Sequence, residues 1–181
     1  MAQWQLDPTH SSADFAARHM MISTVRGGFR NVTGTIDFDP ENPEAASVEA
    51  SIEVASMTST GVADRDNHLK SPDFLDAEKY PMITFKSTRV EKTGDKTAKV
   101  YGDLTIRDVT RPAVIDAELL GIVNSPFGQK VAGFHGTTTI NREDFGLTWN
   151  VAVEGGGVLV GKEIKIALDV EAVPVAEEVR A

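Results

Sequence analysis

Alternation between apolar and polar residues runs through most of the chain. Between Val48 and Val54 every second residue is apolar, and the residues between them are serine or glutamate; stretches at 32–38, 100–106 and 164–170 repeat the alternation. A period of two residues is typical of β-strands that cover an interior with one face and meet solvent with the other. The same reasoning predicts further strands near 13–22, 82–91, 113–123, 130–141 and 147–153.

Short turn signals separate these strands, among them the run from Pro40 to Pro43, the residues around Gly94, and 124–128. Eight or more strands with such connections predict an all-β fold, either an antiparallel barrel or a sandwich. Barrels of about eight strands can hold one small ligand. The 181 residues suffice for a single domain spanning 1–181 with a full core. The alternation is lost at Pro174, where we expect a frayed tail.

The segment from Arg65 to Phe85 is the one long break in this series of strands. It is dense in charged residues but also contains Leu69, Phe74 and Leu75. Long insertions in compact domains are usually functional or disordered, and this one is too rich in apolar side chains for disorder. We therefore predict a short helical segment near 61–78 that forms a lid or side wall, with these three apolar side chains turned inward.

Composition and charge exclude several classes of function. The net charge of -9 argues against a nucleic-acid partner and against a polybasic membrane anchor. The chain has no cysteine, which excludes disulfides, thiolate catalysis and cysteine-based metal sites. No stretch approaches the ~18 apolar residues of a transmembrane helix, and the N-terminal residues lack the features of a signal peptide. We expect a cytoplasmic protein without a transmembrane segment.

Candidate catalytic and metal-binding residues show no spacing that is specific for a known site. The histidines do not form an HExxH or HxH motif, and no GxSxG nucleophile motif occurs. The triple glycine 155–157 precedes a predicted strand, whereas a phosphate-binding loop precedes a helix. Two alternatives remain open: an enzyme that acts on a bound ligand through His19, Asp66 and His68, and a haem or metal site built from histidines. The four histidines are His10, His19, His68 and His135.

Basic side chains could meet an anionic ligand, although in an acidic protein each of them is more often the surface partner of a carboxylate. Alternation predicts that His135 faces solvent, because it shares its parity with Val131 and Thr137 and not with Phe134. The basic candidates are Arg18, Arg26, Arg30, Arg65, Lys79, Arg107, Arg111 and Arg142.

Four ordered motifs are similar to one known family. The run W-x-L-D-x-x-H-S-x-x-D-F-x-x-x-H from Trp4 to His19, followed by G-G-F, resembles the opening of the YceI-like polyisoprenoid-binding family. The segment from Arg65 to Phe85 resembles its central signature. G-D-L-T-I-R-D-V-T-R-P at 102–112 and T-T-I-N-R-E-D-F-G-L-T-W at 138–149 resemble its third and fourth blocks. One departure is Asp108, where the family commonly has glycine, so the turn there can differ.

The resemblance covers about residues 3–172 and leaves 173–181 as the tail. It implies a lipocalin-like antiparallel β-barrel with an elongated apolar pocket that binds a long-chain isoprenoid or similar amphiphilic lipid for carriage, storage or sequestration. It implies no catalysis, no cofactor other than the bound lipid and no metal. Homodimers are common in the family, so a homodimer is possible here.

The ligand-binding residues predicted for the barrel lumen are the aromatic residues and those on the apolar parity of the strands. A ligand head group, if present, would meet His19 at the inner rim or Arg65 and Lys79 beside the lid. The predicted lumen residues are Phe15, Ala17, Phe29, Phe38, Ile52, Phe74, Phe85, Leu104, Ile106, Phe134, Trp149 and Leu168.

Overall fold

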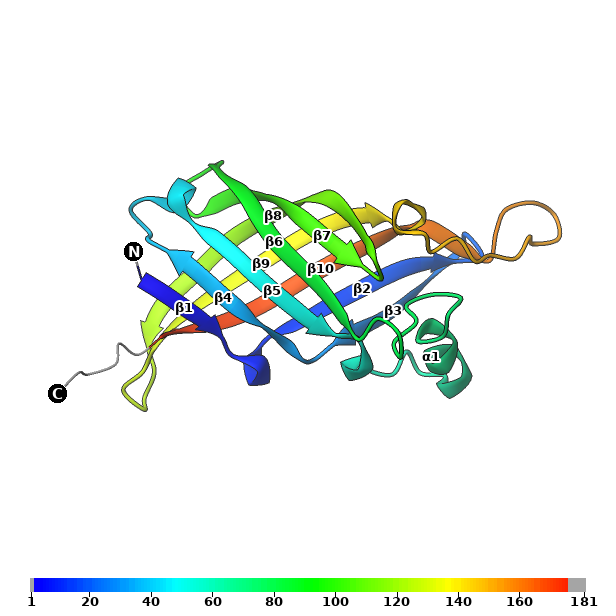
Figure 1. Cartoon of the computed structure of the whole chain (residues 1–181), viewed down its shortest axis with the longest axis horizontal. Coiled ribbons are helices and arrows are strands. Elements are labelled where there is room, and N and C mark those ends of the chain that lie inside the picture. The colour runs from blue at the N-terminus through cyan, green and yellow to red at the C-terminus, as the bar shows by residue number, and fades with distance from the viewer. Residues whose placement is uncertain (1, 176–181) are drawn as a thin grey trace.

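The computed structural model describes residues 2–175 and shows an elongated antiparallel barrel with one short helix at one end (Figure 1). This confirms the predicted fold class. Among residues 2–175, no helix is both long and apolar enough to cross a membrane. The strands are β1 Ala2–Leu6, β2 Ser12–His19, β3 Ser23–Phe29, β4 Val32–Phe38, β5 Ser47–Glu53, β6 Met82–Lys92, β7 Thr97–Ile106, β8 Val109–Asn124, β9 Lys130–Asn141 and β10 Val160–Pro174.

Eight of the strands close the barrel. From β4 to β10 every strand pairs with the next along the chain, and β1 lies between β4 and β10. Two strands pair with the same edge of the long β10. Its C-terminal residues pair with β1, and its N-terminal part, from Val160 to Asp169, pairs with β2. The hairpin of β2 and β3 therefore extends the wall beyond the closed barrel at one end, next to α1 in Figure 1.

Short helices connect the strands at both ends. The α-helix α1, Ala63–Leu69, belongs to the predicted lid, and the rest of that segment folds into turns before β6. A single 3-10 turn, η3, joins β5 to the lid. The 3-10 helices are η1 Pro8–His10, η2 Pro43–Ala45, η3 Val54–Ser56 and η4 Arg142–Phe145.

Alternating burial shows how the pattern in the sequence sets the inner face. In β7, Val100, Leu104 and Ile106 are buried, whereas Tyr101, Asp103 and Thr105 alternate with them on the outer face. Gly102 continues the inner row, and a Cβ atom there would meet the ring of Phe85. A side chain at this position would therefore displace an aromatic ring from the inner wall.

Two predicted strands differ from the structure because of local backbone geometry. The strand predicted over 13–22 ends at His19, because Met20 and Met21 adopt left-handed φ angles of 53° and 65° and turn the chain into β3. The strand predicted over 147–153 is absent. Most of that segment is irregular, with an isolated bridge at Ala152, and the glycines at 155–157 have positive φ angles.

The sheet contains more strand residues than the alternation predicts. The pattern does not predict β1 or β3, because β1 alternates over only five residues and β3 contains two glycines and few apolar residues. β10 continues to Pro174, so the first residues assigned to the tail pair with β1, with Trp4 opposite Pro174. The remainder of the predicted tail, 176–181, lies outside the described residues.

Candidate functional site

A cavity of about 350 Å³ occupies the inside of the barrel. Its wall consists mainly of apolar side chains from the inner faces of the strands. At one end it reaches the connections beside Pro43 and Lys96, and at the other it reaches the lid. The strand β5 connects these ends, and its seven residues span about 20 Å at the usual rise per residue. The cavity is therefore long and narrow.

The predicted lumen residues line this cavity with two exceptions. Ile106 is buried at the end of β7 but does not reach the cavity wall, because the strand turns there. Trp149 lies after β9 in an irregular segment and packs against the lid, with ring centroids 4.5 Å from His68 and 5.4 Å from Phe74. Contact between the other lumen residues and a ligand stays a prediction.

The lid closes one end of the cavity as its composition predicted. Leu69, Phe74 and Leu75 all line the cavity, and Phe74 is buried. Arg107, in the turn after β7, donates a hydrogen bond to the carbonyl of Phe74 at 3.4 Å. Arg107, and not Asp108, has the left-handed φ of 57° in that turn. The lid is thus fixed to the barrel by apolar packing and by a contact from a neighbouring turn.

Charged residues of the lid hold its own backbone in place. The carboxylate of Asp66 accepts hydrogen bonds from the Thr60 hydroxyl, the Thr60 amide and the Ser59 hydroxyl. These bonds, above all that from the Thr60 side chain, lower the pKa of Asp66. His68 lies 2.9 Å from a carboxylate oxygen of Asp73. Both residues therefore stabilise the start and the following turns of α1.

The three predicted head-group residues do not line the cavity. Arg65 donates hydrogen bonds to the hydroxyl and the carbonyl of Thr60. Lys79 is exposed, with its Nζ atom 5.4 Å from the centre of the Tyr80 ring. His19 ends β2 opposite Val160. Parity along β2 placed His19 on the inner face, but the cavity wall stops before that residue.

Arg142 lines the cavity instead, and the sequence marked it only as one of several basic candidates. It is 3% exposed and begins η4, directly after β9. The capping carboxamide of Asn141 and the left-handed Gly146 fix this helix at its two ends. Alternation says nothing about where a 3-10 helix points, so the sequence carried no signal that this arginine is buried.

The Arg142 guanidinium binds backbone carbonyls of the segment that follows. It donates to Leu147 from Nη1 at 2.6 Å, to Gly161 from Nε at 2.9 Å and to Val160 from Nη2 at 3.2 Å. No carboxylate of residues 2–175 forms an ion pair with it. Burial lowers the pKa of Arg142, and the nearby charge of Glu143 opposes this. The cavity thus contains a buried cation beside its lid.

The alternative catalytic residues do not meet in the cavity. None of His19, Asp66 and His68 lines it. The polar interactions of Asp66 are directed at the segment before α1, and those of His68 at Asp73. The structure therefore does not bring these three residues together around a bound lipid.

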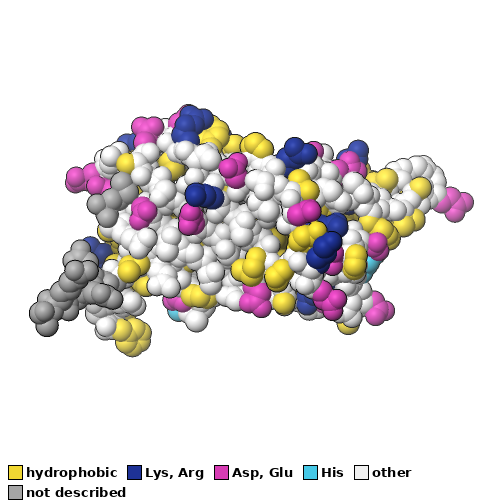
Figure 2. All heavy atoms as spheres, in the orientation of Figure 1, with side chains coloured by type: hydrophobic (Ala, Val, Ile, Leu, Met, Phe, Trp, Pro, Cys, Tyr) yellow, Lys and Arg dark blue, Asp and Glu magenta, His cyan; other side chains and the backbone are white. Residues whose placement is uncertain are grey.

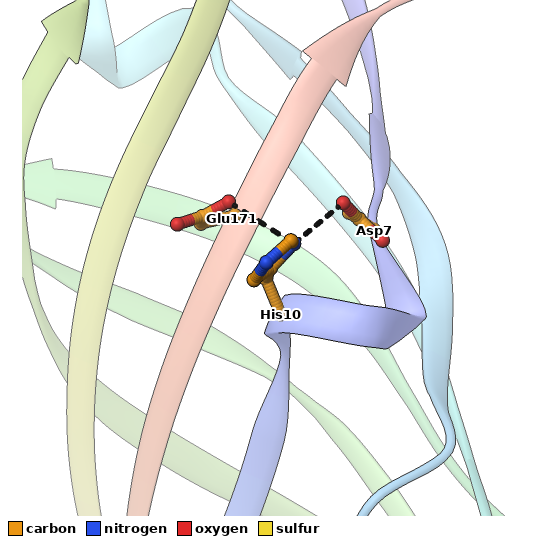
Figure 3. A group of neighbouring side chains, drawn as sticks. All are labelled: Asp7, His10 and Glu171. Carbon is orange, nitrogen blue, oxygen red and sulfur yellow. Dashed lines mark hydrogen bonds and ion pairs between the residues drawn. The ribbon is translucent and has the colours of Figure 1, made fainter. Parts of the chain in front are cut away.

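One histidine lies in a cluster on the outside of the barrel (Figure 3). The Nδ1 atom of His10, on η1, lies 3.0 Å from Asp7 and 3.6 Å from Glu171 on β10. The hydrogen bond to His10 is the main cause that lowers the pKa of Asp7 to about 2, and the bond to Asp7 raises the pKa of His10. The three groups could hold a cation, but an ion pair between them already explains their arrangement.

The remaining histidines are apart from this cluster. The His135 imidazole is directed outward, with its Nδ1 atom 3.0 Å from Asp169, but the residue also contributes to the cavity wall. On the face shown in Figure 2, charged side chains of both signs lie in small groups between uncharged areas. The buried Arg142 lines the cavity, whereas the His10 cluster lies on the outside of the barrel, so the two are separate sites.

Comparison with known proteins identifies the family. A model of the YceI-like domain matches residues 4–172. The chain belongs to the YceI-like domain family. A UPF0312 protein of Pseudomonas savastanoi pv. phaseolicola is 45% identical over 138 residues, which cover 76% of this chain and 71% of the relative.

Solved structures of similar proteins share the fold. The YCEI protein of Campylobacter jejuni is 34% identical, with a TM-score of 0.72 over 88% of this YceI-like chain and 90% of its own. A polyisoprenoid binding domain from Saccharophagus degradans, implicated in plant cell wall breakdown, is 15% identical, with a TM-score of 0.65 over 97% of this chain and 100% of its own. At that identity the second likeness shows the fold alone.

Proposed function

We propose that this YceI-like protein binds a long-chain isoprenoid or a similar amphiphilic lipid inside its barrel, for carriage, storage or sequestration. The observation that carries the proposal is the long apolar cavity, walled by inward-facing side chains and closed at one end by Leu69, Phe74 and Leu75. A narrow apolar space favours a chain-shaped ligand over a compact polar metabolite.

The apolar wall can supply most of the binding free energy. Each buried methylene group contributes about 0.8 kcal/mol, so ten of them contribute about 8 kcal/mol. That value corresponds to a Kd near 1 μM, before the cost of ordering a flexible chain is subtracted. A lipid with more than ten buried carbon atoms therefore suits this site, and shorter chains bind weakly.

An isoprenoid in particular is suggested by membership of the YceI-like family, whose fold is shared by the polyisoprenoid binding domain of S. degradans. We further propose that the protein binds its lipid without transforming it. Support comes from the placement of His19, Asp66 and His68 outside the cavity wall. Incubation with geranylgeraniol, followed by mass spectrometry of the recovered lipid, tests this: a changed mass would refute it.

The decisive experiment is mass spectrometry of organic extracts from the protein purified from its own host. We expect a long-chain lipid in stoichiometric amounts, and we expect the stripped protein to bind geranylgeraniol. A protein that carries no lipid and binds neither geranylgeraniol nor a longer prenyl alcohol would refute the proposal. Native mass spectrometry of the purified protein also shows whether it is a monomer or the homodimer that the family resemblance makes possible.

A further inference from the structure

Arg142 has hydrogen-bonding capacity that the described protein groups do not use. A guanidinium carries five N–H donors. Arg142 uses three of them, one on each nitrogen, to bind the carbonyls of Leu147, Val160 and Gly161. One N–H on Nη1 and one on Nη2 have no acceptor among residues 2–175. These two donors belong to a side chain that lines the cavity.

The positive charge of Arg142 is also uncompensated. Its side chain is 3% exposed, yet no carboxylate of the described chain forms an ion pair with it. Buried charges are normally paired, because an isolated one costs several kcal/mol of desolvation free energy. Three carbonyl dipoles offset part of this cost. An anionic group with two acceptor oxygens would offset more of it and would satisfy both free donors.

The surroundings of Arg142 restrict what such a group can be attached to. The ring of Phe74, from the lid, lies 5.9 Å from the guanidinium carbon, and Leu147 lines the cavity beside it. The anion must therefore carry an apolar portion that fills the adjoining cavity. At the opposite end, the charged lining residues Asp95, Lys96 and Glu118 are exposed and of both signs, so they provide no comparable site for an anion.

We propose that Arg142 binds the anionic head group of a long-chain amphiphile at the lid end of the barrel, with the chain extending toward the turn between β6 and β7. This inference rests on the proposed function and specifies the polarity of the ligand and its direction in the cavity. A carboxylate and a phosphate both offer the paired oxygens that the planar guanidinium fork recognises.

Three ligands with one chain and different head groups test the chemistry. Stripped protein is titrated with geranylgeraniol, geranylgeranoic acid and geranylgeranyl monophosphate. We expect the wild-type protein to bind at least one of the two anionic ligands about 10- to 100-fold more tightly than the alcohol, the range that a charged hydrogen bond provides. The stronger anionic ligand identifies the head group as carboxylate or phosphate. Equal binding of all three would refute the inference.

Two substitutions test the position of the head group. In R142Q the preference for the anion over the alcohol should fall below about threefold, while K79Q, which removes an exposed cation of the lid outside the cavity wall, should keep the wild-type preference. Each preference is a ratio measured within one variant, so partial destabilisation by R142Q affects both ligands alike. Loss of the preference in K79Q, or its retention in R142Q, would overturn the assignment.

A measurement on a protein with Arg142 intact guards against failure of R142Q to fold. Trp149 packs against Phe74 and lies at the lid end. It becomes the single tryptophan in W4F, since the chain has two. Bromine quenches indole fluorescence at short range, so 2-bromohexadecanoic acid should quench Trp149 more strongly than 16-bromohexadecanoic acid. The reverse order, or equal quenching, would refute the proposed direction.

The two proposals fail in different ways. If geranylgeraniol and both anionic ligands fail to bind, the lipid-binding function itself is wrong. If geranylgeraniol binds as tightly as the anions, lipid binding stands and the role of Arg142 is refuted.

Discussion

Replacing Leu104 by aspartate places a carboxyl group in the wall of the cavity. Leu104 is 9% exposed, lines the cavity and pairs with Phe85 across the inner face. A lipid that fills the cavity would remove water from the introduced carboxylate. Desolvation of an ion costs several kcal/mol in real proteins. A cost of about 3–4 kcal/mol corresponds to roughly 100- to 1,000-fold weaker binding at pH 7.

The matched control lies on the same strand and faces outward. The ring of Tyr101 is 4.0 Å from the guanidinium carbon of Arg89 on the outer surface. Aspartate at Tyr101 leaves the cavity wall intact, so we expect geranylgeraniol affinity to stay within about threefold. Phe134 and His135 form a second, less strict pair on β9: both contribute to the cavity wall, but the His135 imidazole is directed to Asp169 on the outer face.

The assay is titration of stripped protein with geranylgeraniol at pH 7 and pH 5, with circular dichroism to confirm that each variant is folded. At pH 5 part of the introduced carboxyl group is protonated once the lipid covers it, so the loss of affinity in L104D should shrink. Equal losses in L104D and Y101D would show that the assignment of inner and outer faces is wrong. An unchanged affinity in L104D would show that the lipid does not occupy this part of the barrel.

Three further predictions concern stability. The pKa of His10 is raised, so its pairing with Asp7 stabilises the fold below pH 6.5, and this contribution is lost as pH rises through the folded-state pKa. The midpoints of urea denaturation at pH 6 and pH 8 should therefore differ less in H10A than in the wild-type protein. An identical difference in both proteins would contradict this prediction. G102A should destabilise the protein by about 1–3 kcal/mol, because the added methyl group clashes with the Phe85 ring. At Gly121 a Cβ atom meets nothing within 4 Å, so G121A should change the free energy of unfolding by less than about 1 kcal/mol. Similar losses of stability for both variants in urea denaturation would refute this prediction. D66A should accelerate proteolysis within 59–79, because it removes the hydrogen bonds that hold the start of the lid. D64A, which changes an exposed residue of the same helix, should leave the rate of proteolysis unchanged. Equal cleavage rates in the two variants would count against the anchoring role of Asp66.

The barrel could be predicted because its strands alternate clearly, as β5 and β7 show. The same alternation placed Phe85, Leu104 and Phe134 on the cavity wall. It failed where the backbone leaves the strand geometry. Met20 and Met21 adopt left-handed φ angles, which methionine rarely does, so the sequence gives no signal for this turn. The segment after Gly146 is irregular although it contains apolar residues. Local pattern predicts the faces of strands but not where strands stop.

The polar part of the site depends on contacts between distant segments, which the sequence does not display. Arg65 and Lys79 are close to the lid in sequence, yet their side chains serve local contacts. Arg142 reaches the lid because η4 follows β9 at the lid end of the barrel. The carbonyl groups that it binds belong to residues up to 19 positions further along the chain. A buried arginine of this kind is found from the folded structure, since its charge type alone predicts exposure.

The seam between β1 and β10 has a consequence for the order of events during synthesis. Leu6 pairs with Ala172 and Trp4 with Pro174, so β1 must wait for β10 before the wall is complete. Until then the nascent sheet exposes its apolar inner face, and pairing across so long a stretch of chain is slow compared with local contacts. The cavity is enclosed only once this long-range pairing has formed, so a chaperone or a captured lipid would act most strongly before β1 and β10 meet.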